Sequence, residues 1–216
     1  MRLLPESARN VLARLNWGLV FRLSARRTIT GVQVGCPPGE RDAEGRIFAK
    51  LGAALRLIEI YAPEDLARLR RLVDRLLVHD GLGGQGEWDA RCRMVCLRTG
   101  FVMGPTTDDA HVAATLVHEV THAWLESYGF RYREDRRGRI ESICYRRQAA
   151  FARRIPGGDP LAVYYEGRAA DALVSDEWAP AAFIERQKRA LARAGVPRWA
   201  IAMFARKAHG APANDR

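Results

Sequence analysis

His118-Glu119-Val120-Thr121-His122 places two imidazoles four residues apart, with a carboxylate directly after the first. On a helix, residues i and i+4 lie one above the other on the same face. Both rings can therefore reach one Zn²⁺, and Glu119 would lie beside the metal, where a bound water would sit. This H-E-x-x-H pattern is typical of zinc-dependent hydrolases in which the glutamate is the general base. Because the pattern is short, its meaning depends on the sequence around it.

The flanking sequence predicts a helix over about 110–128. Thr106, Thr107 or Asp108 is expected to be its N-cap, and Gly129 is expected to end it. A pair of histidines with a glutamate on such a helix favours a metal site over a buried helix whose histidines form only local hydrogen bonds. Four apolar residues recur at the helical spacing that a core-facing stripe requires: Val112, Leu116, Val120 and Trp124.

A catalytic zinc ion usually has three protein ligands and one open position, so the chain must supply a third ligand. Glu126 would stand ~12 Å along the helix axis from His118, which is too far to close a compact site. Glu134 and Asp135 lie in an arginine-rich connection that specifies no geometry. Glu141 falls near the start of a second predicted helix, which can approach the metal from another direction. We therefore expect Glu141 to be the third ligand.

Three segments, 118–125, 129–130 and 141–144, carry a resemblance to a known family. H-E-x-x-H followed by a glutamate on the next helix resembles the gluzincin metallopeptidases. The closer local resemblance is to the peptidase domain of the plant LIM-domain, ubiquitin-activated peptidases and to its bacterial relatives. The resemblance implies a zincin-like fold, Zn²⁺ on His118, His122 and Glu141, and Glu119 as the catalytic base.

The chain also departs from that family. It has no LIM-type cysteine array and no recognisable ubiquitin-binding helix, so activation by ubiquitin does not carry over. Many gluzincins place an aspartate four residues after the ligand glutamate, where it orients a zinc histidine. Tyr145 occupies that position here. The groups that hold the zinc histidines in place are therefore not assigned by the sequence.

The predicted reaction is metal-assisted hydrolysis of a peptide bond. Zn²⁺ lowers the pKa of its water, and Glu119 takes the proton and passes it to the leaving amine. A donor for the oxyanion is also needed. Tyr164 and Tyr165 are our candidates, because they lie on the helix that follows the Glu141 helix. His111, Tyr128 and Arg168 could also serve.

The remaining pattern predicts a helix-rich α+β fold, in which a small twisted sheet packs on the zinc helix and the glutamate helix, with a helical C-terminal part. Strands are predicted over 55–61 and 91–102. The resemblance to gluzincins implies that the second strand lies along the cleft, with Met94 and Cys96 at an edge to which an extended peptide could add by β-augmentation. The predicted helices are 7–15, 46–51, 63–78, 139–153, 160–174, 177–194 and 197–207.

One metallopeptidase domain is expected over 43–209. A loosely ordered or short-helical lead-in over 1–42 would precede it, and a frayed tail over 210–216 would follow. Gly81, Gly83 and Gly86 match G-x-G-x-x-G, but the dinucleotide motif needs a strand before it and a helix after it. The sequence predicts a helix before these glycines and a strand after them, so we interpret them as a flexible turn.

The composition favours a folded, cytoplasmic protein. The chain has 216 residues, of which 48% are hydrophobic, enough for one good core. No apolar run approaches the ~20 residues of a membrane helix, and no signal peptide is recognisable. In a strand, Cys92 and Cys96 would stand more than ~12 Å apart, too far to bind one metal. All four cysteines are therefore expected to be free thiols in a reducing compartment.

The net charge of +10 comes almost entirely from arginine. The densest run, from Arg131 to Arg139, joins the two predicted zinc helices, where it can attract an acidic partner or nucleic acid. A solvated loop is the competing interpretation, and no helix-turn-helix, RNP or zinc-finger pattern is present. Two further functions compete with the peptidase: a non-catalytic, zinc-stabilised binding module and a nucleic-acid-associated regulatory protease. Glu119 argues against the module, because a structural site needs no base.

Overall fold

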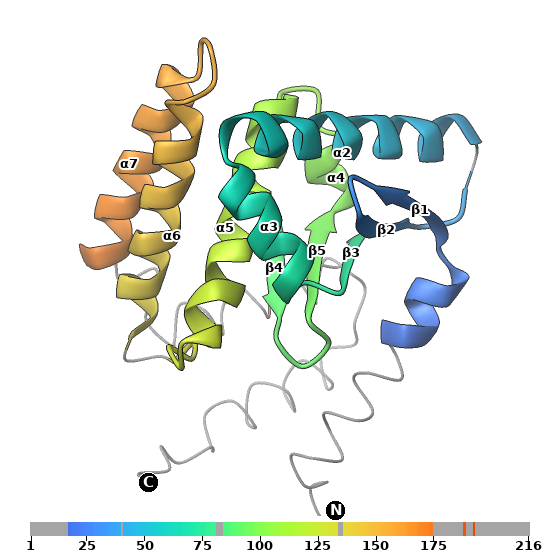
Figure 1. Cartoon of the computed structure of the whole chain (residues 1–216), viewed down its shortest axis with the longest axis horizontal. Coiled ribbons are helices and arrows are strands. Elements are labelled where there is room, and N and C mark those ends of the chain that lie inside the picture. Colours follow the sequence, from blue (N-terminus) through green and yellow to red (C-terminus); the bar gives the residue numbers. More distant parts are fainter. Residues whose placement is uncertain are drawn as a thin grey trace, which may run out of the picture.

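The computed structural model describes residues 17–39, 41–80, 84–133 and 136–174, together with residues 188 and 192. In this part of the chain a five-stranded mixed sheet is covered by helices (Figure 1). The predicted helix-rich α+β class is confirmed. Several predicted segments lie outside the described residues: the helices over 7–15 and 197–207, nearly all of the helix over 177–194, and the tail over 210–216. Within the described residues, no helix is both long and apolar enough to span a bilayer.

The strands lie in the order β1-β2-β3-β5-β4. β1 (Ala25–Ile29) and β2 (Val32–Cys36) form an antiparallel hairpin. β3 (Arg75–His79) runs parallel to β2 and to β5 (Met94–Arg98). β4 (Gly86–Asp89) is antiparallel to β5 and ends the sheet. Within the described residues, β4 therefore presents a free edge.

The expectation that Met94 and Cys96 lie on a free edge is wrong. β5 pairs with β3 on one side and with β4 on the other, and both side chains are buried. The apolar pattern of β5 fits an interior strand as well as an edge strand, so sequence alone could not separate the two. β4 supplies the edge instead. Its four residues, one of them a glycine, give too weak a pattern for a strand to be predicted.

α5 (Asp109–Ser127) is the central helix. It packs against α2 (Arg41–Tyr61), α3 (Pro63–Leu72) and β4 on one side and against α6 (Arg137–Ala152) on another. Figure 1 shows α6 and α7 (Asp159–Val174) side by side, with α6 nearer to α5. The helices predicted around 110–128, 139–153 and 160–174 are thus confirmed. A single turn, α4 (Thr99–Val102), follows β5.

The predicted strand over 55–61 is wrong, because these residues end the long helix α2, which also contains the short helix predicted over 46–51. Leu51, Leu55 and Ile58 are buried and recur at helical spacing. The alternation within the last seven residues is local, whereas the helical period runs through the whole segment. Burial along the full length of α2 therefore decides its structure.

The predicted helix over 63–78 is correct only to Leu72, where α3 ends. Val73 is extended, and the apolar residues Leu76, Leu77 and Val78 form the buried centre of β3. A short apolar run is compatible with a helix or with a strand buried on both faces. The glycine-rich segment is therefore preceded by a strand, β3, and not by the predicted helix. It is followed by the strand β4, whereas the dinucleotide motif needs a helix at that position. The phosphate-loop interpretation stays excluded.

The expectation of a loosely ordered lead-in over 1–42 is wrong for residues 25–36, which form the β1–β2 hairpin. Its turn, Thr30 and Gly31, has positive φ at both positions (46° and 80°), as tight hairpin turns require. Val32, Val34 and Cys36 are buried in the main core. The folded domain therefore begins before residue 25.

Candidate metal centre

α5 holds His118, Glu119 and His122 on a well-defined helix. Its N-cap is Asp108, whose carboxylate accepts the His111 N–H at 2.7 Å. Gly129, with φ of 85°, follows the C-terminal end. The buried stripe of α5 packs into the core, except that Trp124 is half-buried. The two histidines and Glu119 are buried or nearly so on the same helix.

Glu141 of α6 faces both histidines. Its Oε2 lies 3.2 Å from His118 Nε2, and its Oε1 lies 3.7 Å from His122 Nε2. The two imidazole rings have their centroids 4.8 Å apart. α6 therefore crosses α5 as a helix carrying the third ligand must, and the three side chains can reach one metal ion.

Cys144 lies one turn beyond Glu141 on α6 and belongs to the same cluster. Its Sγ and one ring nitrogen from each of His118 and His122 lie within 4.8 Å of one another, a grouping that can hold a metal ion. Cys144 is not among the ligands predicted from the sequence. Cys144 follows Glu141 by three residues on the same helix, and this spacing was the feature of the sequence that could have placed it in the cluster. The structure therefore offers two residues on α6 as a third ligand, a carboxylate and a thiol.

Gln148 orients His118. The side-chain oxygen of Gln148 lies 2.7 Å from His118 Nδ1, and both residues are buried. Because an amide oxygen only accepts, Nδ1 carries the proton, and Nε2 points towards Glu141. Metal-binding histidines usually have such a partner on the other ring nitrogen. Gln148 thus holds His118 in place, a role that the sequence alone left unassigned, and it lies two turns beyond Glu141.

Glu119 lies against the edge strand. Its carboxylate accepts the backbone N–H of Trp88 in β4. A Cβ at Gly86 would stand 2.9 Å from Glu119 Oε1, so a larger residue at this position would force the Glu119 carboxylate to shift. Burial raises the pKa of Glu119 to about 7, and the charge of Glu141 also raises it, while His118 lowers it. A carboxyl group with this pKa is suited to accept a proton near neutral pH.

In the metal-free protein, burial and neighbouring charges set the pKa of each of the three candidate metal ligands. Burial opposes ionisation of Glu141, but the hydrogen bond from His118 and the charges of both histidines hold its pKa at about 2. Burial also opposes the charge on His118, yet Glu141 and Glu119 raise its pKa above the ordinary value. Burial lowers the pKa of His122 to about 4, and the charge of His118 contributes to this shift. In mildly acidic solution the metal-free cluster therefore favours a charged His118 beside a neutral His122 and an ionised Glu141.

Tyr132 closes the cluster from the α5–α6 connection. Its hydroxyl donates to Glu141 Oε1, and its ring lies 5.3 Å from the His122 ring. Arg137 Nε donates to the Tyr132 hydroxyl at 3.0 Å, and Arg137 is buried. The arginine run from Arg131 to Arg139 is therefore only partly solvated, because one member faces the candidate site. Glu134 and Asp135 lie outside the described residues.

The structure does not bring Tyr164 and Tyr165 to the cluster, which corrects their assignment as oxyanion donors. Both rings lie beside His111, with centroids 6.3 Å and 5.8 Å away. His111 precedes His118 by seven residues, or ~10 Å along the helix. Tyr165 is buried, and Tyr164 is half-exposed beside it. The two tyrosines therefore pack at the other end of α5.

Tyr128 and Arg168 have structural roles of their own. Tyr128 is exposed and packs on Trp124. Arg168 Nη2 donates to the Tyr145 hydroxyl at 3.3 Å, and the Tyr145 ring lies 4.8 Å from the His118 ring. Tyr145 therefore packs against His118 and separates it from the tyrosines of α7.

The described residues thus bring His118, His122 and Glu141 together with Glu119, and they add Cys144, Gln148 and Tyr132. This arrangement can bind a metal ion beside a carboxylate whose pKa suits a base. No family model, curated protein or solved structure matches the chain. The choice of metal and reaction therefore rests on the geometry of this cluster.

Proposed function

We propose that this protein is a zinc metallopeptidase with a zincin-like fold, in which His118, His122 and Glu141 hold Zn²⁺ and Glu119 is the general base. One observation carries the proposal. Two imidazole Nε2 atoms and both oxygens of one carboxylate converge in a buried cluster, and a further carboxylate stands beside them at a sheet edge. A purely structural site has no need of that second carboxylate.

The donor set fits zinc. Around a tetrahedral zinc ion with bond lengths of ~2.0–2.2 Å, neighbouring donor atoms stand ~3.3–3.6 Å apart. The 3.2 Å and 3.7 Å separations of the Glu141 oxygens from the two Nε2 atoms are close to this spacing. Two imidazoles and one carboxylate are also a known ligand set of catalytic zinc. When bound, the ion would supply a Lewis acid that polarises the scissile carbonyl and lowers the pKa of water.

Glu119 is the residue that moves the proton. It would accept a proton from the attacking water on its carboxylate and return it to the leaving amine. The N–H of Trp88 holds the carboxylate at the β4 edge. An extended peptide can pair with that edge by β-augmentation, which would lay its backbone across the cluster.

Tyr132 is the best-placed oxyanion donor in the described structure. Its hydroxyl already reaches the Glu141 carboxylate, and Arg137 supports it from behind. A phenol that already reaches an anionic oxygen of the cluster can donate to an oxyanion that develops beside that oxygen. This role replaces the one first expected of Tyr164 and Tyr165.

The test is Glu119→Gln in the full chain. The amide has nearly the shape of the carboxylate but cannot take a proton, so we expect peptide hydrolysis to fall about 10²–10⁴-fold, with the zinc content unchanged and the melting temperature not lowered. Glu166→Gln is the matched control, because Glu166 is an exposed carboxylate paired with Arg153. Full activity in Glu119→Gln would show that the base is assigned wrongly.

Cys144 favours a second candidate, a metal-stabilised binding module. Its thiol belongs to the cluster with both histidines, and thiolate ligands are characteristic of structural zinc sites that have no open position. In that case metal would stabilise the fold without any hydrolysis. Removal of the metal would then lower the melting temperature of the wild-type protein, and Cys144→Ser would lower it by a similar amount.

A further inference from the structure

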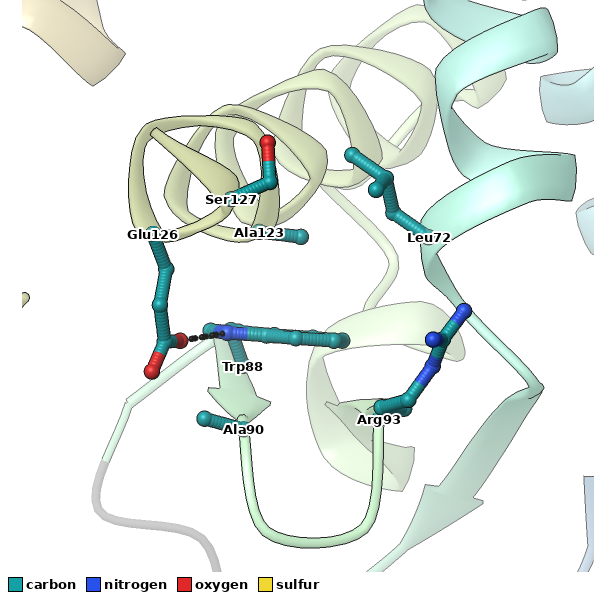
Figure 2. Close-up of a pocket in the computed structure, with 7 residues that line it drawn as sticks. All are labelled: Leu72, Trp88, Ala90, Arg93, Ala123, Glu126 and Ser127. Carbon is teal, nitrogen blue, oxygen red and sulfur yellow. Dashed lines mark hydrogen bonds between the residues drawn. The ribbon is translucent and has the colours of Figure 1, made fainter. Parts of the chain in front are cut away.

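A pocket of about 180 Å³ lies beyond the metal cluster, between the end of α5, β4 and the end of α3 (Figure 2). Its apolar surface comes from Leu72, Trp88 and Ala123, and its charged groups are Glu126 and Arg93. Figure 2 shows Glu126 at one end of the Trp88 indole and Leu72 and Arg93 at the other. The pocket plays no part in the reaction proposed above.

The pocket continues the candidate site along both of its walls. On α5, Ala123 follows His122 directly, and Glu126 lies one turn further on, on the same face as His122. On β4, the backbone N–H of Trp88 binds Glu119 while its side chain lines the pocket. A peptide that pairs with β4 across the cluster would therefore pass the mouth of this pocket.

The charges in the pocket favour a cation. Glu126 Oε2 accepts the Trp88 Nε1–H at 2.8 Å, which fixes the carboxylate at the edge of the indole. Arg93 is engaged elsewhere, because its Nε lies 3.2 Å from Asp74 and its Nη2 donates to the Arg71 carbonyl. Within the described residues, Glu126 forms no ion pair. Glu126 is therefore the group in the pocket that a positive charge would meet.

The size and lining of the pocket fit a single long side chain. Its volume of about 180 Å³ is far above the ~10–15 Å³ that one water needs. It is below the ~300–1,000 Å³ of sites that enclose a whole small molecule. A lysine or arginine side chain has an aliphatic stem for Trp88 and Leu72 and a cationic end for Glu126. The indole face adds a cation–π contribution.

We propose that this pocket is a specificity subsite for a lysine or arginine side chain of an extended peptide bound at the β4 edge. In such a peptide every second side chain points to the same face as Trp88, so one position relative to the cleaved bond would enter the pocket. The inference rests on the proposed peptidase function. Glu126, too far from His118 to bind the metal, would select the substrate instead.

Binding tests the subsite separately from catalysis. In the zinc-loaded Glu119→Gln protein, we expect extended peptides with one arginine to bind about tenfold more tightly than the same peptides with neutral citrulline. Glu126→Gln on this background should abolish the difference and keep the hydrogen bond to Trp88 through its amide oxygen. Glu166→Gln should retain the difference. Equal affinity for the two peptides, or no binding of either, would overturn the subsite.

Cleavage provides the second readout. With a mixed peptide library, the wild-type protein should enrich lysine and arginine at one position relative to the cleaved bond. Glu126→Gln should lose this enrichment, so that basic peptides are cleaved no faster than their neutral counterparts, and Glu126→Lys should shift the preference towards acidic residues. Cleavage with no basic preference would overturn the subsite and leave the peptidase standing. Charge-selective binding without cleavage would overturn the peptidase and leave the subsite standing.

Discussion

In the proposed zinc site, His118 is the residue whose proton the metal must displace. Its pKa is raised above the ordinary 6.5 because Glu141 and Glu119 outweigh the effect of burial. The pKa of His122 is about 4 and that of Glu141 about 2, so both already have the form that binds a metal in mildly acidic solution. A metal ligand must be deprotonated to bind, which couples metal affinity to pH.

Zinc binding between pH ~5 and ~6.5 is therefore expected to release one proton from His118 and up to one more from Glu119, whose pKa of about 7 keeps its carboxyl protonated in this range until a cation binds beside it. Because the pKa of His118 is raised above 6.5, the protonated form of His118 predominates in this range, so the affinity should fall at least about tenfold for each unit by which the pH drops. Calorimetry in buffers of different ionisation enthalpy measures the number of protons released. His111→Asn is the control, since His111 lies outside the cluster, and it should release the same number. Zinc binding without any proton release would contradict the charges assigned to the cluster.

At the scale of single residues, the sequence predicts those members of the cluster whose chemistry is most constrained. His118, Glu119 and His122 follow from spacing on one helix, and Glu141 follows from the need for a ligand on a second helix. Gln148 and Tyr132 could not be predicted, because an amide or a phenol can serve at many places. Their roles depend on how α6 crosses α5 and on the path of the connection between them.

At the scale of elements, the contact of β4 with α5 gives the site its form. β4 is short and carries a glycine, so its local pattern is weak. It becomes significant because its residue Trp88 meets Glu119. The sequence predicts an edge strand before the zinc helix, but its apolar pattern assigns the edge to the neighbouring strand, β5. Whether a strand lies inside a sheet or at its edge depends on partners that are distant in sequence.

Gly86→Ala tests this contact. The added Cβ would stand 2.9 Å from Glu119 Oε1 and 3.1 Å from the Leu97 side chain, so the carboxylate must shift. We expect hydrolysis to fall by about 10²-fold, as for a ~1 Å misplacement of a catalytic group, with the zinc content unchanged. Gly84→Ala is the control, because its nearest neighbour would be at an ordinary 3.5 Å. Wild-type activity in Gly86→Ala would show that the β4 contact does not position Glu119.

The incorrect element assignments share one physical cause. The end of α2 and the start of β3 are short apolar stretches whose local pattern fits a helix or a strand. α2 is settled by a helical period that extends over its whole length, and β3 is settled by pairing on both sides. Tertiary burial overrides local propensity in both segments, and a single sequence does not reveal the pairing partners.

At the scale of the whole molecule, the candidate site forms where three layers meet. The sheet edge β4 lies on one side of α5, and α6 lies on another. The connection between α5 and α6 brings Tyr132 to the cluster, and Arg137, the first residue of α6, donates to its hydroxyl. Arg137 is thus an arginine that faces the candidate site, and the net charge of +10 does not show which arginines do so.

The central claim is that Glu141 completes a zinc site with His118 and His122, with Cys144 beside it. Zinc content and zinc-dependent melting temperature of the full chain, measured for the wild type, Glu141→Ala and Cys144→Ser, test this claim most directly. We predict one zinc per chain in the wild type and in Cys144→Ser, and loss of most bound zinc in Glu141→Ala. Zinc retained by Glu141→Ala and lost by Cys144→Ser would contradict the account.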